Sequence, residues 1–430
     1  MSLMKIKDLF HFEKGVLQSS KCIPGEFDFI TASSEWKSHN EYTHDCEALI
    51  FAAAASGSLG RTHYVKGKFI SSDLCFIITP KDQKKYPIDL KFYHLIFQTL
   101  KDEIVRNTKA GTSKEAIGLT VFGNYELPYF DIAKQIETKE KFVQAQKPTI
   151  GLSTELTHQL ALVKQLRQSF LREAMQGKLT ADFRCAHPEL IEGENSAQAL
   201  LEKLKAEKKR LITDEKLKKE KELPPIKEEE IPFEIPESWV WCRLNDIITM
   251  LGDGIHGTPN YDSQGDYYFI NGNNLIDGKI EIKENTKKVS DQEYEKYKKD
   301  LTNNTIFVSI NGTLGNIAYY NKEKVILGKS ACYFNLMSEI EKYYIGYYVK
   351  SSYFFKYAVD VASETTIKNV SLKSMRLLPL PLPPLSEQQA IVSKLDKLMR
   401  TCDELETSIR TNQQQNEMLL QQVLREALEG

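Results

Sequence analysis

The sequence predicts an α+β protein in which two similar strand-rich α/β domains are separated by two long antiparallel helices forming a coiled-coil spacer. Three observations predict this pseudo-two-fold tandem repeat: a long internal duplication, a heptad pattern at the end of each copy, and short β-type runs before it.

The duplication is clearest at the ends of the copies, where LREAMQG at 171–177 returns as LREALEG at 424–430. Residues 111–177 align with 364–430 without a gap, and 15 of 67 positions are identical, against about 4 expected from composition. Upstream, LIFAAAASGSLGRTHYV from Leu49 resembles TIFVSINGTLGNIAYY from Thr305. A repeat this long indicates two similar structural units rather than a solenoid, whose period is about 20–50 residues.

Apolar residues recur at alternating spacings of four and three in both helices, which predicts a helix–helix seam. The apolar seam positions are Phe142, Leu152, Leu156, Val163, Leu166 and Phe170 in the first helix, and Ile391, Leu395, Leu398, Leu405, Ile409, Leu419 and Val423 in the second. The polar Gln159 and Asn412 at equivalent positions suggest a fixed register. The alternative is one amphipathic helix packed on its own domain. Pro148 should kink or interrupt the first helix.

Short β-type runs with turn signals, such as TIFVSINGTLGNIAYY and KVILGKSACYFNL, predict the strand-rich cores, with helices near 91–101 and 344–357. The charge-balanced, proline-broken stretch between the copies reads as a solvated connector. The expected organisation is a first strand-rich domain at 1–130, a helical spacer at 131–180, a charged connector at 181–235, a second strand-rich domain at 236–384, and a second helical spacer at 385–430.

Composition is that of a globular protein, with 41% hydrophobic and 27% charged residues. Seven cysteines without a CxxC pair favour a reducing compartment, and the sequence shows neither a membrane-spanning run nor a signal peptide. We therefore expect a cytoplasmic protein. A net charge of −2 argues mildly against a nucleic-acid binder, although a basic face can coexist with acidic surface elsewhere.

No catalytic or metal motif stands out. GDGIHG at 252–257 fits the dinucleotide pattern, but TPNYDSQG follows and cannot open the helix that the pattern requires. P-loop, HExxH and GxSxG motifs are missing, and His39 with His44 is weak as a metal pair. The chemistry that remains is binding.

Loops rich in Gly, Asn, Thr, Ser and His occur at matching places in both copies, and such side chains can read base edges while Lys and Arg hold phosphates. A turn residue without a ligand is the commoner role for each. The candidate DNA contacts are Ser58, Arg61, His63, Lys109, Thr112, Ser113 and Lys114 in the first copy, and His256, Thr258, Asn260, Tyr261, Asn273, Asn274, Thr313, Asn316, Thr365, Thr366 and Lys368 in the second.

Over nearly its full length the chain resembles the specificity subunit of type I restriction–modification enzymes. The residues that carry the resemblance are IPESWVWCRLNDI, GDGIHGTPNYDSQGDYYFINGNNLIDGKI, TIFVSINGTLGNIA, LPLPPLSEQQAIVSKLDKL and FLREAMQGKLTADFR. The chain departs from the pattern in two places. Its first helix opens with LPYFDIAKQIE instead of LPPLSEQQAIV, and the Pro-x-x-Trp entry at Pro236–Trp239 has no counterpart near Met4.

The resemblance implies a non-catalytic subunit whose two recognition domains each read one half of a bipartite site in double-stranded DNA. The helices then act as a ruler and dock two methyltransferase subunits, and motor–nuclease subunits join for cleavage. S-adenosylmethionine, ATP and magnesium belong to those partners, and no cofactor is expected in this chain. Two alternatives stay open: a tandem protein-interaction or coiled-coil module without a DNA role, and an unrecognised nucleic-acid hydrolase.

Overall fold

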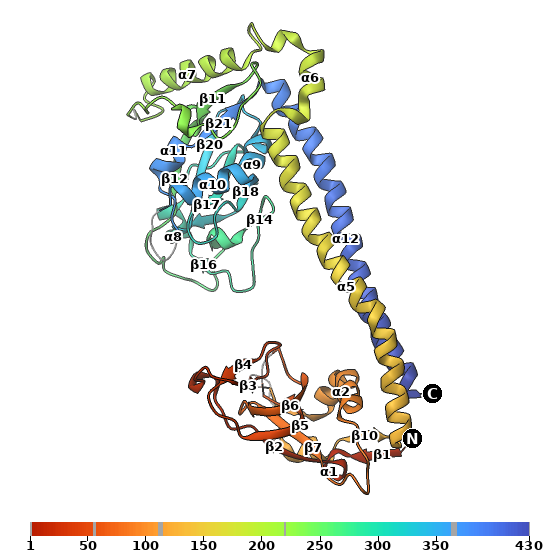
Figure 1. The fold of residues 1–430 in the computed structure, drawn as a ribbon. Coiled ribbons are helices and arrows are strands. Elements are labelled where there is room, and N and C mark those ends of the chain that lie inside the picture. Colours follow the sequence, from red (N-terminus) through yellow and green to blue (C-terminus); the bar gives the residue numbers. More distant parts are fainter. Residues whose placement is uncertain (1, 55–56, 111–114, 219–220, 363–367, 430) are drawn as a thin grey trace. The chain divides into compact units, whose positions relative to one another are not determined.

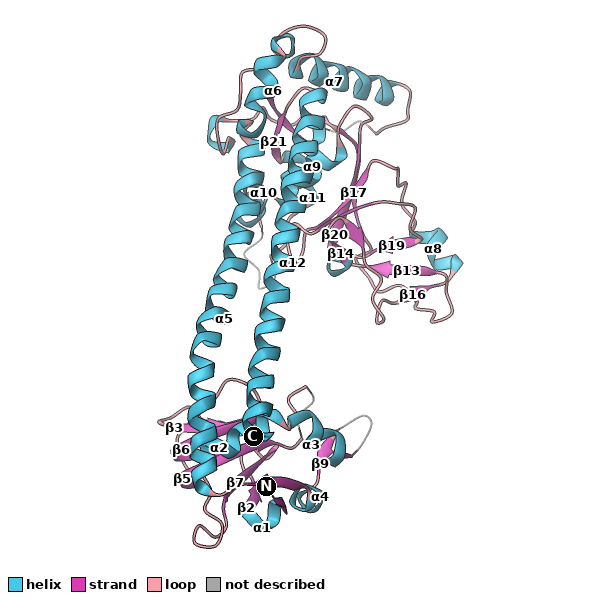
Figure 2. Ribbon diagram, turned by 90° about the vertical axis from the view of Figure 1, so that its right-hand side faces the viewer, coloured by secondary structure: helices cyan, strands magenta, loops and turns pink. Residues whose placement is uncertain are grey.

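The protein is described from a computed structural model that covers residues 2–54, 57–110, 115–218, 221–362 and 368–429 (Figure 1). The chain divides into two compact units. Unit 1 contains residues 1–159 and 408–430, and unit 2 contains residues 160–407. Each unit is built from a strand-rich domain and a stretch of two long helices, coloured by structure type in Figure 2.

Unit 1 contains a six-stranded sheet in the order β2-β7-β5-β6-β3-β4, in which β3 runs parallel to β6. The strands of unit 1 are β1 (Ser2–Lys5), β2 (Phe10–Lys14), β3 (Phe27–Ile30), β4 (Lys37–His39), β5 (His44–Ala52), β6 (Thr62–Ser71), β7 (Cys75–Pro80), β8 (Lys109–Ala110), β9 (Ala116–Ile117) and β10 (Glu126–Tyr129). Its short helices are α1 (Ile6–Leu9), η1 (Ser19–Lys21), α2 (Leu90–Thr99), α3 (Lys101–Thr108) and α4 (Leu119–Asn124).

Alternation along β5 divides the core of unit 1 into two layers. Leu49 and Phe51 point into the cluster that α2 covers, whereas Ala48 and Ile50 belong to the cluster on the other face. Because successive strand side chains point to opposite faces, an apolar run such as ALIFA buries both faces of the sheet.

Unit 2 repeats this plan with two larger sheets, β12-β20-β17-β18 and β16-β13-β19, and with the two-stranded sheets β11-β21 and β14-β15. Its strands are β11 (Val240–Arg243), β12 (Ile248–Asp253), β13 (Tyr267–Ile270), β14 (Leu275–Ile276), β15 (Lys279–Ile280), β16 (Lys288–Val289), β17 (Thr305–Ser309), β18 (Ile317–Tyr319), β19 (Val325–Leu327), β20 (Ala331–Leu336) and β21 (Pro379–Leu382). Its helices are η2 (Lys178–Thr180), α6 (Ala181–Ala186), η3 (Pro188–Leu190), α7 (Ala197–Thr213), η4 (Glu228–Glu230), η5 (Leu244–Asp246), η6 (Gly272–Asn274), α8 (Asp291–Tyr297), α9 (Lys342–Lys350), α10 (Ser352–Asp360) and α11 (Leu372–Leu377).

Strand pairing shows that the two domains are versions of one design. The parallel pair β3–β6 corresponds to β13–β19, because each first strand also pairs antiparallel with a short strand, β4 or β16. The antiparallel pair β1–β10 corresponds to β11–β21, and β10 and β21 each lead into a long helix. The duplication predicted from the sequence is therefore present in the topology.

The long helices are α5 (Ile132–Met175) and α12 (Leu385–Glu429), which lie side by side in Figures 1 and 2. In unit 2, Arg167 pairs with Asp403 at 2.6 Å and Glu406 at 3.1 Å, and Lys394 donates to the Leu179 carbonyl at 3.1 Å. Residue numbers rise on one helix as they fall on the other, so the helices are antiparallel. In unit 1, Asn416 Nδ2 donates to the Thr149 carbonyl at 2.9 Å.

Three details differ from the sequence-based expectations. Pro148 lies inside α5 without interrupting it, because a proline removes one helical hydrogen bond while the rest of the helix holds. The expected helix at 344–357 is two helices, α9 and α10, separated by Ser351. The stretch read as a solvated connector is packed on unit 2, since Leu200, Leu201 and Leu204 of α7 are buried in its core.

Candidate nucleic-acid interface

The candidate residues on the β5–β6 turn of unit 1 are turned toward their own domain. Arg61 donates through Nη1 to the Ala32 carbonyl at 2.9 Å and to Ser58 Oγ at 3.1 Å. The Arg61 backbone N–H also donates to the Ser58 carbonyl at 3.0 Å. This guanidinium therefore holds the turn against Ala32. A hydrogen bond from Arg61 to a base would have to replace these bonds.

His63 uses both ring nitrogens within unit 1. Nε2 lies 2.9 Å from the Ser33 carbonyl, and Nδ1 lies 3.3 Å from Trp36 Nε1. The indole N–H can only donate, so Nδ1 accepts and Nε2 carries the proton. Burial lowers the pKa of His63, and the neighbouring Arg61 charge lowers it further. His63 is thus held neutral and orients Trp36, whose side chain is 40% exposed.

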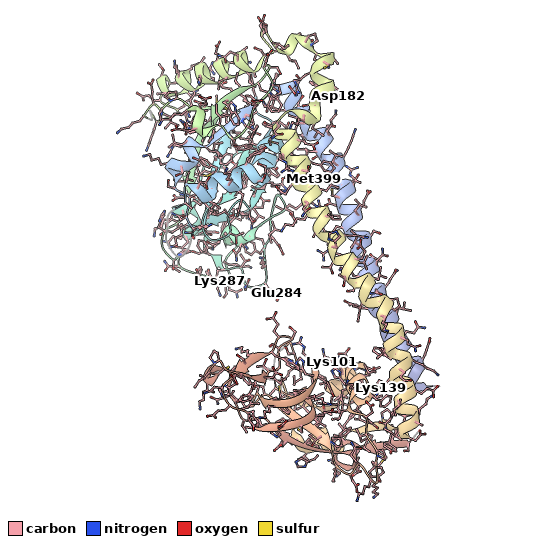
Figure 3. The ribbon with its side chains drawn as sticks, viewed as in Figure 1. Lys101, Lys139, Asp182, Glu284, Lys287 and Met399 are labelled. Carbon is pink, nitrogen blue, oxygen red and sulfur yellow. The ribbon has the colours of Figure 1, made fainter. Side chains whose placement is uncertain are left out.

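Trp36 and His63 line a hollow of about 450 Å³ that the sequence patterns did not reveal. Tyr64 and His94 line the same hollow, as do Lys91 of α2 and Lys139 of α5, and Figure 3 labels Lys139. An exposed indole beside lysines is suited to a nucleic acid, since aromatic faces contact bases and ammonium groups contact phosphates. A lone tryptophan in a polar stretch gives no periodic signal by which to find it.

The remaining candidates in unit 1 are Lys109 and the three residues at 112–114. Lys109 on β8 forms an ion pair with Glu115 at 2.7 Å, with both side chains partly exposed. Thr112, Ser113 and Lys114 lie outside the described residues, as do Thr365 and Thr366 of the second copy.

In unit 2 the loop after β12 is held by carboxylates. His256, whose side chain is 75% exposed, contacts Asp253 through Nε2 at 2.7 Å. The backbone N–H and Nδ2 of Asn260 both donate to the Glu293 carboxylate, at 3.1 Å each. Thr258 between them is exposed. The loop therefore offers Thr258 and His256 to a partner, whereas Asn260 serves to anchor it to α8.

The neighbouring residues Asn273 and Asn274 behave oppositely. Asn274 is buried, and its side chain accepts from the Asn271 N–H and donates to the Glu281 carbonyl, both at 2.9 Å. Asn273 is exposed, and its carbonyl accepts from Lys283 Nζ at 2.9 Å. Asn274 is thus committed to shaping its loop, and Asn273 is free to face solvent.

The remaining candidates of unit 2 lie on two adjoining loops. The Gly312 N–H donates to the Lys368 carbonyl at 3.2 Å, which brings exposed Thr313 and Lys368 into one region. Asn316 is half-buried, and its backbone N–H donates to Ser309 Oγ at 2.9 Å.

A basic hollow of about 620 Å³ lies beside the β13–β16 edge of unit 2. Tyr261, Tyr268, Lys283, Lys287 and Lys288 line it, together with Glu284, and Figure 3 labels Lys287 and Glu284 at this loop. Lys288 Nζ lies 5.5 Å from the centre of the Tyr268 ring, and Tyr261 is 49% exposed. Among the residues that line this hollow, only Tyr261 is a candidate from the sequence, because isolated lysines form no motif.

The seam positions of the long helices fall into two groups. Phe142, Leu156, Val163, Ile391, Leu395 and Ile409 are buried, and Phe170 and Leu398 are half-buried. Leu152, Leu166, Leu405 and Leu419 are exposed by 38–53% and depart from the expected seam, and the Val423 side chain lies outside the described set. On each helix these exposed positions alternate with buried ones, such as Leu156 and Val163, so the two helices contact each other mainly through one of the two seam positions of each heptad.

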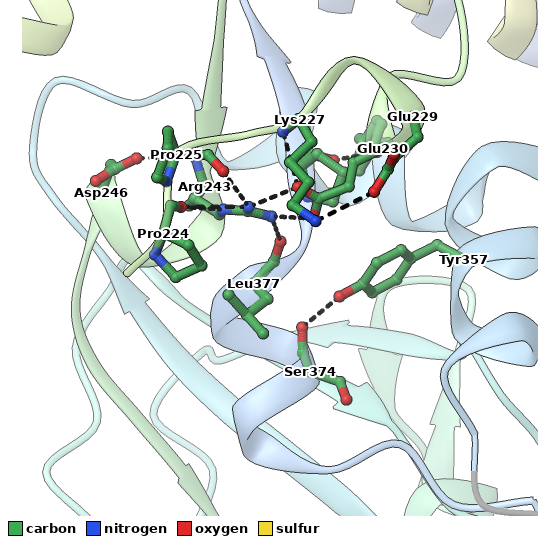
Figure 4. Close-up of polar contacts among 12 residues, drawn as sticks. Pro224, Pro225, Lys227, Glu229, Glu230, Arg243, Asp246, Tyr357, Ser374 and Leu377 are labelled. Carbon is green, nitrogen blue, oxygen red and sulfur yellow. Dashed lines mark hydrogen bonds and ion pairs between the residues drawn. The ribbon is translucent and has the colours of Figure 1, made fainter. Parts of the chain in front are cut away.

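Polar contacts also bind the charged stretch to unit 2. Arg243, 4% exposed, meets Glu230 through two parallel bonds of 2.8 and 2.9 Å, and donates to the carbonyls of Pro224 and Pro225 (Figure 4). This contact fixes the extended segment before β11 against the domain.

Neither a membrane-crossing helix nor a group of three or more potential metal ligands is found in the part of the chain that the structure describes. Two repeated β-rich domains with exposed basic and aromatic loops, each continuous with antiparallel helices, define a duplicated binding scaffold. The chain belongs to the type I restriction modification DNA specificity domain family, whose model matches residues 1–161 and 236–414. The two matched stretches include the strand-rich domains of both units.

Individual relatives agree with this assignment. The chain is 30% identical to the type I restriction enzyme EcoAI specificity subunit of Escherichia coli, over 59% of this chain and 43% of that protein. It is 22% identical to the E. coli EcoDI specificity subunit, over 94% of this chain and 82% of that protein. The match to the EcoAI subunit thus spans less than half of that protein's length. A chain from a solved structure on complex assembly and conformational transition of the type I R-M system shares the fold, with TM-score 0.54 and 15% identity over 99% of this chain and 97% of that one.

Proposed function

We propose that this chain reads a bipartite site in double-stranded DNA, with one recognition domain on each half-site. The repeated topology supports this most directly, because two copies of one binding design are what two half-sites require. Residues 1–130 and 236–384 are assigned to recognition, and residues 131–180 and 385–430 to the helical spacer, with 181–235 as the connector. Half-sites about one helical turn (~34 Å) apart present the same side of the duplex.

The contact surface proposed for the second half-site is the basic hollow with the exposed loop residues near it. Lys283, Lys287 and Lys288 supply positive charge, and exposed Asn273 and Thr258 supply hydrogen-bonding groups. Lysines position the duplex by its phosphates, whereas amides and hydroxyls can discriminate base edges. For the first half-site the corresponding surface is the hollow around Trp36 and Lys91.

The long helices are proposed to dock two methyltransferase subunits, with motor–nuclease subunits joining for cleavage. An apolar stripe on α5 within unit 1 supports a protein partner there: Ile132, Ile136, Val143 and Ile150 are all 39–56% exposed. At 100° per residue these four positions lie within about 40° of one another on the helix. S-adenosylmethionine, ATP and magnesium are assigned to the partner subunits, and the complex to the cytoplasm.

The test is single-molecule sequencing of methylated adenines in cells that express the chain with its methyltransferase partner, against cells without the chain. A new split motif, with two short half-sites and a fixed unspecified spacer, is the expected result. Exchanging residues 1–130 for those of a relative should change one half of the motif and leave the other intact. A soluble complex that produces no new methylation contradicts the DNA-reading role and favours a protein-interaction module instead.

A further inference from the structure

A fully buried glutamine stands in the first turn of each long helix. Gln135 of α5 and Gln388 of α12 are both 0% exposed. The two positions coincide when the chain is aligned on its repeat, and they are identical although their neighbours are not. Lys134 corresponds to Glu387, and Ile136 corresponds to Gln389.

Gln135 joins the start of α5 to the start of α2. Its Oε1 accepts from the Asp89 N–H at 2.8 Å, and its Nε2 donates to the carbonyls of Phe130 at 2.7 Å and Pro87 at 2.9 Å. Asp89 in turn caps α2 by accepting from the Phe92 N–H at 2.9 Å. One side chain therefore connects the helix start, the residue that follows β10, and the cap of the helix covering the sheet.

Gln388 makes the same connection in unit 2. Its Oε1 accepts from the Glu341 N–H at 3.0 Å, and its Nε2 donates to the Pro383 carbonyl at 2.9 Å. Glu341 caps α9 as Asp89 caps α2, by accepting from the Tyr343 N–H. Pro383 is the repeat equivalent of Phe130, so both the acceptor carbonyl and the capped helix are retained.

A buried tyrosine reinforces each joint. Tyr93 of α2 donates to the Pro128 carbonyl at 3.2 Å, and Tyr344 of α9 donates to the Pro381 carbonyl at 2.8 Å. Pro128 and Pro381 are again repeat equivalents, in β10 and β21. Buried polar groups of this kind are costly to leave unpaired, which gives the joint a single preferred geometry.

We propose that Gln135 and Gln388 are equivalent positioning residues, which fix the orientation of each recognition domain on its own long helix and thereby set discrimination at its own half-site. The second part of this inference rests on the proposed DNA-reading function. The physical reason is that base readout depends on placing side chains within hydrogen-bonding distance of base edges, so a small rotation of the domain removes that discrimination.

The test measures how tightly the complex with the methyltransferase partner binds its matched DNA target and targets that carry one substitution in one half-site. It is made with the Gln135→Leu and Gln388→Leu variants. Because each mismatched base pair weakens binding, loss of one readout should lower the discrimination between matched and mismatched targets by about tenfold. Q135L should lower the discrimination at one half-site, and Q388L should lower it at the other. Ile78→Val in the unit 1 core serves as a control for ordinary destabilisation. Gln135→Glu, which keeps the acceptor for Asp89, serves if the leucine variant does not fold.

A second readout does not depend on DNA. Single-molecule energy transfer between dyes at the exposed positions Asp102 and Glu155, both in unit 1, should give a wider distance distribution in Q135L but not in Q388L. The inference is overturned if the discrimination and the distance distribution are both unchanged. It is also overturned if discrimination falls equally at both half-sites, or falls equally in the Ile78→Val control. If the wild-type complex yields no split motif, the proposed function fails, and the distance distribution alone decides whether the glutamine fixes the domain.

Discussion

Trp239 and Glu387 meet in the interior of unit 2, where the indole Nε1–H donates to Glu387 Oε2 at 2.7 Å. The other carboxylate oxygen, Oε1, accepts from Thr180 Oγ1 at 2.7 Å and from Arg184 Nη1 at 2.6 Å. Glu387 is 0% exposed. One carboxylate therefore joins the segment after α5, the entry to the second domain and the first turn of α12.

Removing this carboxylate should destabilise unit 2. Glu387→Ala leaves the Arg184 charge, 19% exposed, and the buried indole N–H without their acceptor, and breaking a buried pair costs about 3–5 kcal/mol. Urea unfolding followed by tryptophan fluorescence measures this, because Trp239 and Trp241 both lie in unit 2. Glu189→Ala removes an exposed carboxylate of the same unit and should leave the midpoint in place. Equal midpoints for the two variants contradict a structural role for Glu387.

The Arg243–Glu230 contact should control whether the segment before β11 stays attached. Arg243→Lys keeps the charge but cannot form two parallel bonds, so the segment around Pro224 should become more sensitive to limited proteolysis. Arg210→Lys on the exposed surface of α7 is the matched control. Identical cleavage patterns in both variants refute this role.

The same contact predicts a pH dependence. The hydrogen bond from Arg243 holds the pKa of Glu230 below its ordinary value of 4.5. A lowered carboxyl pKa contributes stability above the unfolded value, and this contribution is lost as pH falls through the lowered value. Wild-type protein should therefore release the segment below about pH 4.5, whereas cleavage of the Glu230→Gln variant should vary less with pH in this range. A steeper pH dependence in the variant contradicts the assignment.

The sequence predicts what periodicity encodes and misses what single contacts decide. The duplication, the buried strands and seam residues such as Ile391 and Leu395 follow from repeated patterns, because burial on one face needs regular spacing. Asn273 and Asn274 are indistinguishable in composition, yet loop geometry exposes one and buries the other. The Arg243–Glu230 pair lies in a charge-rich stretch where no pattern selects one partner.

Acidification should also loosen the hollow around Trp36. Burial lowers the pKa of His63 and of His94 below their ordinary value of 6.5. A lowered histidine pKa means that the stabilisation is present above about pH 6.5 and is lost as pH falls, since the unfolded state protonates first. Protonation also turns Nδ1 of His63 into a donor, which ends its bond from Trp36.

Trp36 is the tryptophan of unit 1, so its fluorescence reports this change in a Trp239→Phe, Trp241→Phe background. Emission should shift as pH falls below about 6.5 in that background, and the transition should disappear in His63→Asn. His158→Asn, on the exposed face of α5, should leave it unchanged. A transition that survives in His63→Asn assigns it to another group.

Neutralising the lysines of the unit 2 hollow should weaken DNA binding without changing the sequence read. Lys283, Lys287 and Lys288 replaced together by Gln remove three positive charges beside Tyr261 and Tyr268. If all three contact phosphates, the slope of log affinity against log salt should fall by about 2.7, at roughly 0.9 per contact. Fluorescence anisotropy of the complex on a labelled duplex at several salt concentrations measures the slope, and Lys209→Gln on exposed α7 is the control. An unchanged slope moves the contact surface away from this hollow, whereas a changed motif with an unchanged slope assigns these lysines to base readout.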